Sequence, residues 1–432
     1  MRFCNRLVCC IGFCFVSIFT LGMECQSAPD NNNNANNNDN TNDNTNVSNL
    51  VAVVTGIELH VQADIVAGDD VIAFGTGGFS GVQYVIPSAN DTAGRDIPGG
   101  SNFVAGMINV VGKKIICYSS DFAAHVYDTE TDTVEDVALN EVRLTNLPIG
   151  KAGRVTSGDG YVVVRCDDGE VDDGNQLKMI DVSDNTPVVV PFTSYPAGTS
   201  DFAHAAVDKT RNQVVAVDDE KLLFYDAANP DAAPTEVDTS TNMVNGQSNS
   251  VDNSVPIYAD DGVVLFISSP DGLAFLYLVD SDSYVQLSTN RAGQADYTLR
   301  AGSYGIFLNE VADDSIGSDL RSGIGTVSST EPTFADVEDL RFEGTTNGGA
   351  FGYGQEIEVT TDGGTWFICG SESIGSAETL QVSSGGKFVN VPDPAGVNEL
   401  GVPATDVSIS DNVIAFKSGA QQDTVVAYII LN

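Results

Sequence analysis

The sequence predicts an all-β chain made of repeated four-stranded units, and three observations lead to this prediction. Short apolar segments follow acidic or glycine-containing turns along most of the 432 residues. The 43 glycines, with few long helical runs between them, favour short strands joined by tight turns. The apolar content of 42% is enough to bury a large core in a chain of this length.

The apolar strands recur with a regular period. Intervals of 42 to 61 residues separate eight of them, which begin at Val71, Ile115, Tyr161, Val214, Val263, Gly305, Trp366 and Val413. A second apolar strand follows most of these, and several of the second strands end on an aspartate at the turn, namely Asp128, Asp181, Asp226 and Asp280. Such an aspartate can accept a hydrogen bond from the backbone amide two residues on.

A segment rich in small residues precedes each of the eight strands, as in AHAAVD (203–208) and ATDVSIS (404–410). Four strands in a unit of ~40 to 50 residues are typical of a β-propeller, in which small side chains suit the crowded innermost strand. The prediction is eight blades, or seven if the weak sixth unit at Gly305–Asn309 is not a blade. A pair of β-sandwiches is the competing architecture.

The last unit stops after its third strand at the chain end. Leu50–Thr55 precedes the first complete unit, and we expect it to supply the missing outer strand. Pairing of the two ends of the propeller would leave no open sheet edge there. The predicted propeller therefore spans residues 50–432 and is closed by an N-terminal strand.

The N-terminus has the layout of a secretory signal peptide at residues 1–25, with Arg2 and Arg6 before an apolar run. An Asn-rich tract within residues 26–49 cannot bury apolar surface and is predicted to be a disordered linker. A signal ending on Cys25 resembles the start of a bacterial lipoprotein, in which this cysteine carries the lipid anchor. Leu21 and Glu24 depart from that pattern, so cleavage a few residues later, with release of a soluble protein, is the alternative.

Three cysteines, Cys117, Cys166 and Cys369, would remain after removal of the signal. Each lies inside an apolar strand pattern, and their spacing matches no disulfide framework or metal knuckle. We expect buried small hydrophobic side chains at all three.

The charge of the chain is strongly negative, because 19 Lys and Arg face 60 Asp and Glu, for a formal net charge of −41. Such a surface repels phosphate backbones, so no nucleic-acid partner is expected. Clustered carboxylates could still bind Ca²⁺, and Asp168, Glu170 and Asp172 are the candidate ligands. A solvated loop at a blade tip is the alternative for this segment, and no other cofactor is expected.

Three segments carry a family resemblance. The stretches AHVYDTETDTVEDV (124–137) and LKMIDVSDNTPVVV (177–190) resemble the repeats of bacterial surface propellers related to WD40-like and YVTN-type domains. The stretch TTDGGTWF (Thr360–Phe367) resembles the Asp-box of sialidase-type propellers, which implies a structural hairpin and no catalytic role.

The candidate binding residues at the mouth of the predicted channel are His204, Arg154 and Arg300. Cations are scarce in this chain, so positive groups that converge there would form a small anion site. Pairing of each arginine with a neighbouring aspartate is the alternative. A structural role is the interpretation for His60 and His125 and the alternative for His204. No GxSxG segment accompanies the histidines, so the sequence shows no catalytic constellation.

These features predict an exported monomer in the cell envelope or outside the cell, with no membrane contact beyond an N-terminal lipid anchor. Its expected role is that of a binding or scaffold module for a protein or glycan at the cell surface. The alternative is a secreted hydrolase or lyase that acts on a polysaccharide at the channel mouth.

Overall fold

The computed structural model describes residues 50–59, 63–76, 81–119, 123–139, 143–144, 156–167, 175–192, 204–218, 220–240, 243–244, 247–252, 257–269, 272–287, 297–300, 302–311, 318–326, 338–342, 356–360, 364–370, 379–384, 387–396, 401–419 and 424–431. All of them belong to the unit Asp43–Asn432. The expected signal peptide and the expected linker, with Cys25, lie outside the described residues.

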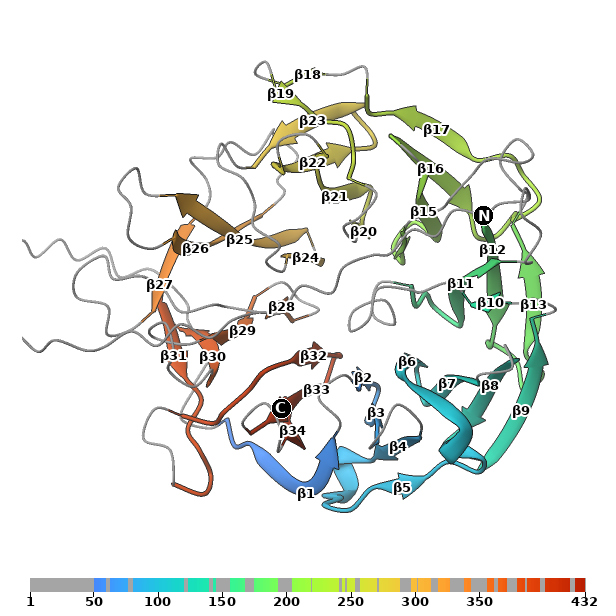
Figure 1. The fold of residues 1–432 in the computed structure, drawn as a ribbon, viewed down its shortest axis with the longest axis vertical. Helices are drawn as coiled ribbons and strands as arrows, with labels where there is room; N and C mark the ends of the chain where they lie inside the picture. Colours follow the sequence, from blue (N-terminus) through green and yellow to red (C-terminus); the bar gives the residue numbers. More distant parts are fainter. Residues whose placement is uncertain are drawn as a thin grey trace, which may run out of the picture. The chain divides into compact units, whose positions relative to one another are not determined.

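The described residues form an all-β propeller without an α-helix, as the sequence predicts (Figure 1). Each unit runs through a first, second, third and fourth strand, which pair in that order as an antiparallel sheet. The first strands are β2 (Ile65–Gly68), β6 (Phe103–Val111), β10 (Arg143–Leu144), β14 (Ala205–Asp208), β20 (Tyr258–Asp260), β24 (Tyr297–Arg300), β28 (Glu356–Val359) and β32 (Val407–Ile409). The second strands are β3 (Val71–Gly75), β7 (Lys114–Ser119), β11 (Tyr161–Asp167), β15 (Gln213–Asp218), β21 (Val263–Ile267), β25 (Ser303–Val311), β29 (Trp366–Gly370) and β33 (Val413–Ser418).

The third and fourth strands complete each unit. The third strands are β4 (Val82–Val85), β8 (Ala123–Asp128), β12 (Asn175–Asp181), β16 (Lys221–Asp226), β22 (Ala274–Leu278), β26 (Ser318–Thr326), β30 (Thr379–Ser384) and β34 (Thr424–Ile430). The fourth strands are β5 (Arg95–Asp96), β9 (Thr133–Ala138), β13 (Val188–Pro191), β17 (Thr235–Asp238), β23 (Ser283–Gln286), β27 (Glu338–Phe342), β31 (Lys387–Asn390) and β1 (Val53–Leu59). A small hairpin, β18 (Met243–Val244) with β19 (Gln247–Ser248), lies outside this pattern.

Counted as hydrogen-bonded sheets, the described propeller has seven blades, which matches the alternative count from the sequence. Six sheets have four strands and the seventh has eight, because the outer strands β27 and β31 pair in parallel. The joined blade contains the weak sixth unit, whose strands β25 and β26 pair over nine residues each. The four-stranded unit therefore occurs eight times in seven sheets.

The hydrophobic core lies between neighbouring sheets, where the apolar faces of second and third strands meet. Ile72 and Phe74 of one sheet pack with Ala415 and Tyr428 of the next, and similar clusters fill the other described interfaces. The second strands are buried on both faces, which explains their continuous apolar runs in the sequence.

The first and last described strands close the propeller, as predicted from Leu50–Thr55. Strand β1 pairs with β34 through Val53–Tyr428 and Val54–Ala427, and an irregularity separates these pairs from a second set that extends to Leu59. The hydroxyl of Thr55 donates to the carbonyl of Val426 at 2.7 Å. The closing strand is thus longer than the sequence pattern indicates, and it makes the fourth strand of the last sheet.

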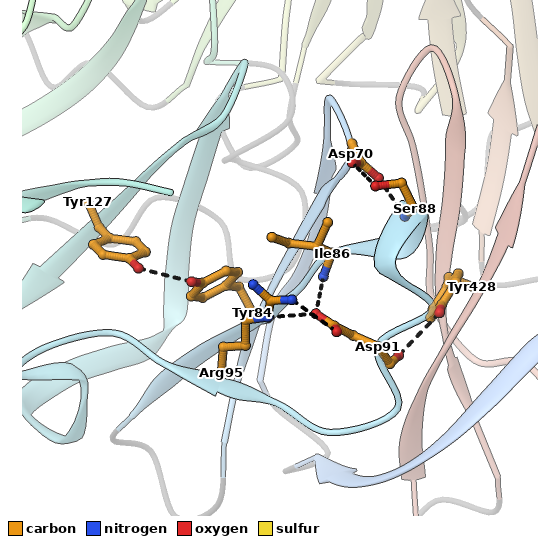
Figure 2. A network of polar contacts seen from close by, with 8 residues as sticks. All are labelled: Asp70, Tyr84, Ile86, Ser88, Asp91, Arg95, Tyr127 and Tyr428. Carbon is orange, nitrogen blue, oxygen red and sulfur yellow. Dashed lines mark hydrogen bonds and ion pairs between the residues drawn. The ribbon is translucent and has the colours of Figure 1, made fainter. Parts of the chain in front are cut away.

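Side-chain bonds tie the closing sheet to the sheet beside it (Figure 2). The Tyr428 hydroxyl on β34 donates to the backbone carbonyl of Asp91 at 3.2 Å. The Asp91 carboxylate accepts from Arg95 Nη2 at 3.0 Å and from the amide of Ile86 at 3.0 Å. One aspartate therefore anchors its own loop and contacts the sheet that holds both ends of the propeller.

The turn aspartates behave largely as predicted. Asp128 accepts a hydrogen bond from the amide two residues on at 2.8 Å, and Asp181 and Asp226 do so at 2.9 Å. Asp280 instead accepts two hydrogen bonds from the guanidinium of Arg211 in the neighbouring sheet, at 2.8 and 2.6 Å. The predicted turn therefore holds at three positions, and the fourth carboxylate joins two blades.

Two further local predictions are confirmed. TTDGGTWF spans the hairpin of β28 and β29, where Val359 pairs with Trp366 and the Thr365 amide donates to Thr360 Oγ1 at 3.0 Å. Cys117 and Cys369 are buried free thiols, and burial raises the pKa of Cys117. Cys166 lies on β11, but its side chain is outside the description.

Candidate functional site

A cavity of about 970 Å³ lies where the first strands end and turn into the second strands. Residues of all eight four-stranded units line it, so it marks one mouth of the central channel. The turns around it are tight. Asp70 (φ 57°) and Gly112 (φ 58°) adopt the left-handed conformation that such turns require, which explains why aspartate and glycine recur there in the sequence.

The cavity is richer in positive charge than the chain as a whole. Its lining has four cations, Lys113, Lys114, Lys209 and Arg300. Its carboxylates are Asp69, Asp128, Glu130, Asp159, Asp260, Glu358 and Asp411. Four cations to seven carboxylates compares with 19 to 60 in the whole sequence, so both signs of charge meet at this mouth.

Two of these lysines are held by protein groups. Lys113 Nζ forms an ion pair with Glu130 Oε1 at 2.6 Å, and this contact raises the pKa of Lys113. Lys114 Nζ donates to the carbonyl oxygens of Val182 at 2.5 Å and Asp184 at 2.7 Å, which links one sheet to the next. Both ammonium groups therefore contribute mainly to the architecture.

Arg300 reaches across the joined sheet and the closing sheet. Its Nη1 donates to the carbonyl oxygens of Ile409 at 3.3 Å and Val359 at 3.5 Å, at the ends of β32 and β28. No partner among the described residues occupies its Nη2 or Nε groups. The guanidinium is thus anchored on one side and available on the other.

Lys209 lies on the turn that follows β14, and its ammonium makes no hydrogen bond or ion pair with a described residue. Lys209 is exposed as a residue, but partial desolvation by the surrounding protein lowers the pKa of Lys209, and the positive charge of Arg300 lowers it further. Solvent screening limits the size of this shift. The carboxylates of Asp159, Asp411 and Asp69 act in the opposite direction. These three carboxylates come from three different sheets, so the lysine side chain extends toward the middle of the mouth.

The structure separates Arg300 from His204, two of the three residues that the sequence places together. Arg300 lines the cavity, whereas His204 lies before the start of β14, at the other end of the strand from Lys209, and is absent from the lining. The carbonyl of His204 accepts from the Val217 amide at 2.9 Å. Arg154 lies outside the described residues. Ligand binding by this set stays a prediction.

The other predicted sites also fall outside the described residues, namely the lipid anchor Cys25 and the Ca²⁺ ligands Asp168, Glu170 and Asp172. Within the part of the chain that is described, no group of three or more His, Cys, Asp or Glu side chains is placed to bind a metal ion. No helix there has the length and apolar character needed to cross a bilayer.

Lys209 is the residue that sequence reasoning missed at this mouth. Its signal is present in the segment VDKTRN (207–212), where two cations follow an innermost strand in a chain with few cations. The strand pattern places such a turn at the channel, but it does not tell which way the side chain points.

A second cluster lies on the sheet of β7, β8 and β9. His125 Nε2 is 2.9 Å from Ser119 Oγ, and His125 Nδ1 is 2.6 Å from Asp136 Oδ1. Cross-strand neighbours bring these three side chains together, and the ring of Phe103 packs on the imidazole with centroids 4.7 Å apart. None of the three residues in the hydrogen-bonded chain lines the channel cavity.

The Ser119–His125–Asp136 chain has the order of hydrogen bonds that a nucleophilic serine, its base and an orienting carboxylate require. Ser119 is only 6% exposed, and its hydroxyl donates to the carbonyl oxygen of Ala123 at 3.3 Å, which competes with donation to His125. The Asp136 side chain is 77% exposed. An exposed carboxylate is well solvated, which weakens its effect on the imidazole. The distances between the three side chains therefore fit a catalytic role, whereas the burial of Ser119 and the exposure of Asp136 do not favour it.

Comparison with known proteins gives the fold. No family model matches the chain, and no curated protein is similar in sequence. BamB from Moraxella catarrhalis is similar in structure, with a TM-score of 0.50, 12% identity, and coverage of 88% of this chain and 100% of BamB. The WD40 domain of SCAP from fission yeast has a TM-score of 0.51, 10% identity, and coverage of 88% and 98%.

The fold of this chain is that of a WD40-like β-propeller. A third similar structure, dihydro-heme d1 dehydrogenase NirN in complex with DHE, has a TM-score of 0.50 at 14% identity, with coverage of 85% of this chain and 75% of NirN. At identities this low, the similarity shows that the propeller fold is shared, and it gives no information about activity.

Proposed function

We propose that this chain is an exported WD40-like β-propeller that acts as a binding module at the cell surface, with its partner held at the channel mouth. The observation that carries the proposal is the cavity of about 970 Å³, to which all eight units contribute residues. Concave sites with a few convergent polar groups are the usual places for ligands. The partner is a protein or a glycan.

Export and tethering are part of the proposal and rest on residues 1–49. Arg2 and Arg6, the apolar run and Cys25 support a signal with a lipid anchor, and the Asn-rich tract would act as a flexible tether. Replacement of Cys25 by Ser should move the protein from the membrane fraction to the medium. Unchanged membrane association of C25S would contradict the anchor.

The binding role can be tested by charge reversal at the mouth. The double variant D69K/D411K changes two exposed carboxylates of the cavity lining, and neither makes a hydrogen bond to a described residue. The matched control E58K/E135K carries the same charge change on the outer strands β1 and β9. Capture of envelope components by the purified chain should be lost in the first variant and kept in the control.

Equal capture by both variants would place the partner elsewhere and contradict the mouth as the binding site. The polysaccharide hydrolase or lyase considered from the sequence needs its acid and base at this same mouth. His204, near which the sequence places its site, does not line the cavity, so the binding role has the stronger support.

Ester hydrolysis at Ser119 is a second candidate function, because the hydrogen-bonded chain through His125 to Asp136 has the required distances. Ser119 Oγ would attack the ester carbonyl carbon while His125 takes its proton, and the C–O bond to the alcohol would break as His125 returns that proton to the leaving alcohol. Water, deprotonated by His125, would then hydrolyse the acyl–serine ester and release the acid. A fluorophosphonate probe should label wild type at Ser119 and should not label S119A or H125A. The absence of labelling in wild type would exclude this activity.

A further inference from the structure

The channel mouth presents both signs of charge in positions that protein groups leave available. Lys209 and the outer edge of the Arg300 guanidinium make no contact with a described partner on the side that faces the cavity. The exposed carboxylates of Asp69, Asp159 and Asp411 are likewise without a hydrogen-bond partner among the described residues. These five groups come from five of the eight units.

The charges lie within electrostatic reach of one another. The pKa of Lys209 is lowered by its enclosure and by Arg300, and it responds to all three carboxylates. The lysine ammonium therefore lies near enough to Arg300 and to the acidic turns to interact with both.

This arrangement discriminates between classes of ligand by charge. A polyanion meets a surface with a formal net charge of −41 and the three carboxylates at the mouth. A simple cation meets Lys209 and Arg300, whose positive charges oppose its entry. A ligand with one negative and one positive group satisfies both sets, because its carboxylate can accept from the two cations and its ammonium can donate to the aspartates.

We propose that the channel mouth binds a free amino acid, with the carboxylate on Lys209 and Arg300 and the ammonium on the acidic turns. The cavity of about 970 Å³ is large enough for any of the common amino acids together with bridging water. The inference rests on the proposed function, since it assigns to the same site a small ligand in addition to the protein or glycan partner.

Thermal unfolding of the mature chain with each of the twenty common amino acids tests the inference. A ligand that binds the folded state alone raises Tm, and saturation in a protein of this size corresponds to about 2–3 °C. At least one amino acid should give this shift in wild type. Its deaminated analogue, which keeps the carboxylate, and its decarboxylated analogue, which keeps the ammonium, should each give less than about a third of it.

Lys209→Met removes the free ammonium and keeps the length of the side chain. The matched control is Lys221→Met, which changes a lysine of the same sheet that pairs with Glu236 at 2.6 Å and does not line the cavity. The amino-acid shift should disappear in K209M and persist in K221M. Since Lys209 makes no side-chain bond to a described residue, K209M should fold.

Several results would overturn the inference. These are no shift with any amino acid, an equal shift with a mono-charged analogue, an equal shift in K209M, or binding of a peptide without binding of the free amino acid. If the D69K/D411K variant loses its envelope partner while no amino acid shifts wild type, the binding role stands and the amino-acid ligand is refuted.

Discussion

The two ends of the innermost strands carry polar residues that differ sharply in their surroundings. Asp64 and Asp406 directly precede β2 and β32, and they are 3% and 5% exposed. Asp69 and Asp411 lie five residues later in each case, past the ends of the same strands, and both are exposed. His204 and Lys209 flank β14 with the same spacing. Aspartate is thus buried at one end of an innermost strand and exposed at the other end, five residues later.

The buried end shows the requirements of architecture. Asp406 forms an ion pair with Lys417 at 2.9 Å, and Asp64 accepts from the amide of Ile65 at 2.9 Å. Buried charges and dipoles need such partners, because water cannot replace them. At the mouth the carboxylates of Asp69 and Asp411 are exposed, so water solvates them. The difference teaches that burial and pairing distinguish the structural aspartates from those available for binding.

The largest expected effect comes from breaking the buried pair. The side chains of Lys417 and Asp406 are 9% and 8% exposed, so Asp406→Leu would leave a buried ammonium without its partner. We expect a loss of about 3–5 kcal/mol in the free energy of unfolding, measured by denaturant titration. The double variant D406L/K417M should recover most of it. A loss below about 1 kcal/mol in the single variant would contradict the structural role that we assign to the buried aspartates at this end of the innermost strands.

A smaller effect should follow from Asp208, which lies at the mouth end but is 2% exposed. Its carboxylate accepts from the amides of Gly262 at 2.7 Å, Asp261 at 3.0 Å and Arg211 at 3.1 Å. Asp208→Ala should cost about 1–3 kcal/mol, since buried amides lose their acceptor. The variant separates burial from position along the strand. If D208A were as stable as wild type, the position of an aspartate along the strand, and not its burial, would determine whether it contributes to stability.

The exposed carboxylates should contribute still less to stability. Asp159→Asn and Asp411→Asn each change a side chain that no described residue bonds, so the free energy of unfolding should stay within about 0.5 kcal/mol of wild type. Chemical denaturation of both variants beside D208A measures the difference. A loss above about 1 kcal/mol in either one would mean that this carboxylate is structural.

Much of the fold could be predicted from the sequence, because a propeller repeats one unit and each unit buries its second and third strands. The closing role of Leu50–Thr55 could be predicted for the same reason, since the last unit lacks its fourth strand. The joining of two units through Arg341–Lys387 could not be, because parallel pairing of outer strands leaves no periodic signal.

The candidate site was less accessible to sequence reasoning. Arg300 was expected near the start of or along an innermost strand, but it is the last residue of β24 and lines the cavity. His204 was grouped with it because it opens an innermost strand, and it lies just before β14, at the opposite end from the cavity. Ser119, His125 and Asp136 come together through cross-strand register, which apolar periodicity does not determine.

The smallest expected effect concerns pH and Lys209, whose pKa in the folded state lies below its ordinary value of 10.5. Below the lowered pKa the lysine is protonated in both states, and the folded state bears a cost that the solvent around this exposed residue reduces. Between the lowered pKa and 10.5 the unfolded chain binds more protons, so stability rises with pH in that interval. K209M should therefore have the higher Tm at pH 7, and the difference from wild type should vanish as pH approaches 10.5. A difference that is independent of pH, or a wild type with the higher Tm at pH 7, would show that the ammonium is as well solvated as the aspartates around it.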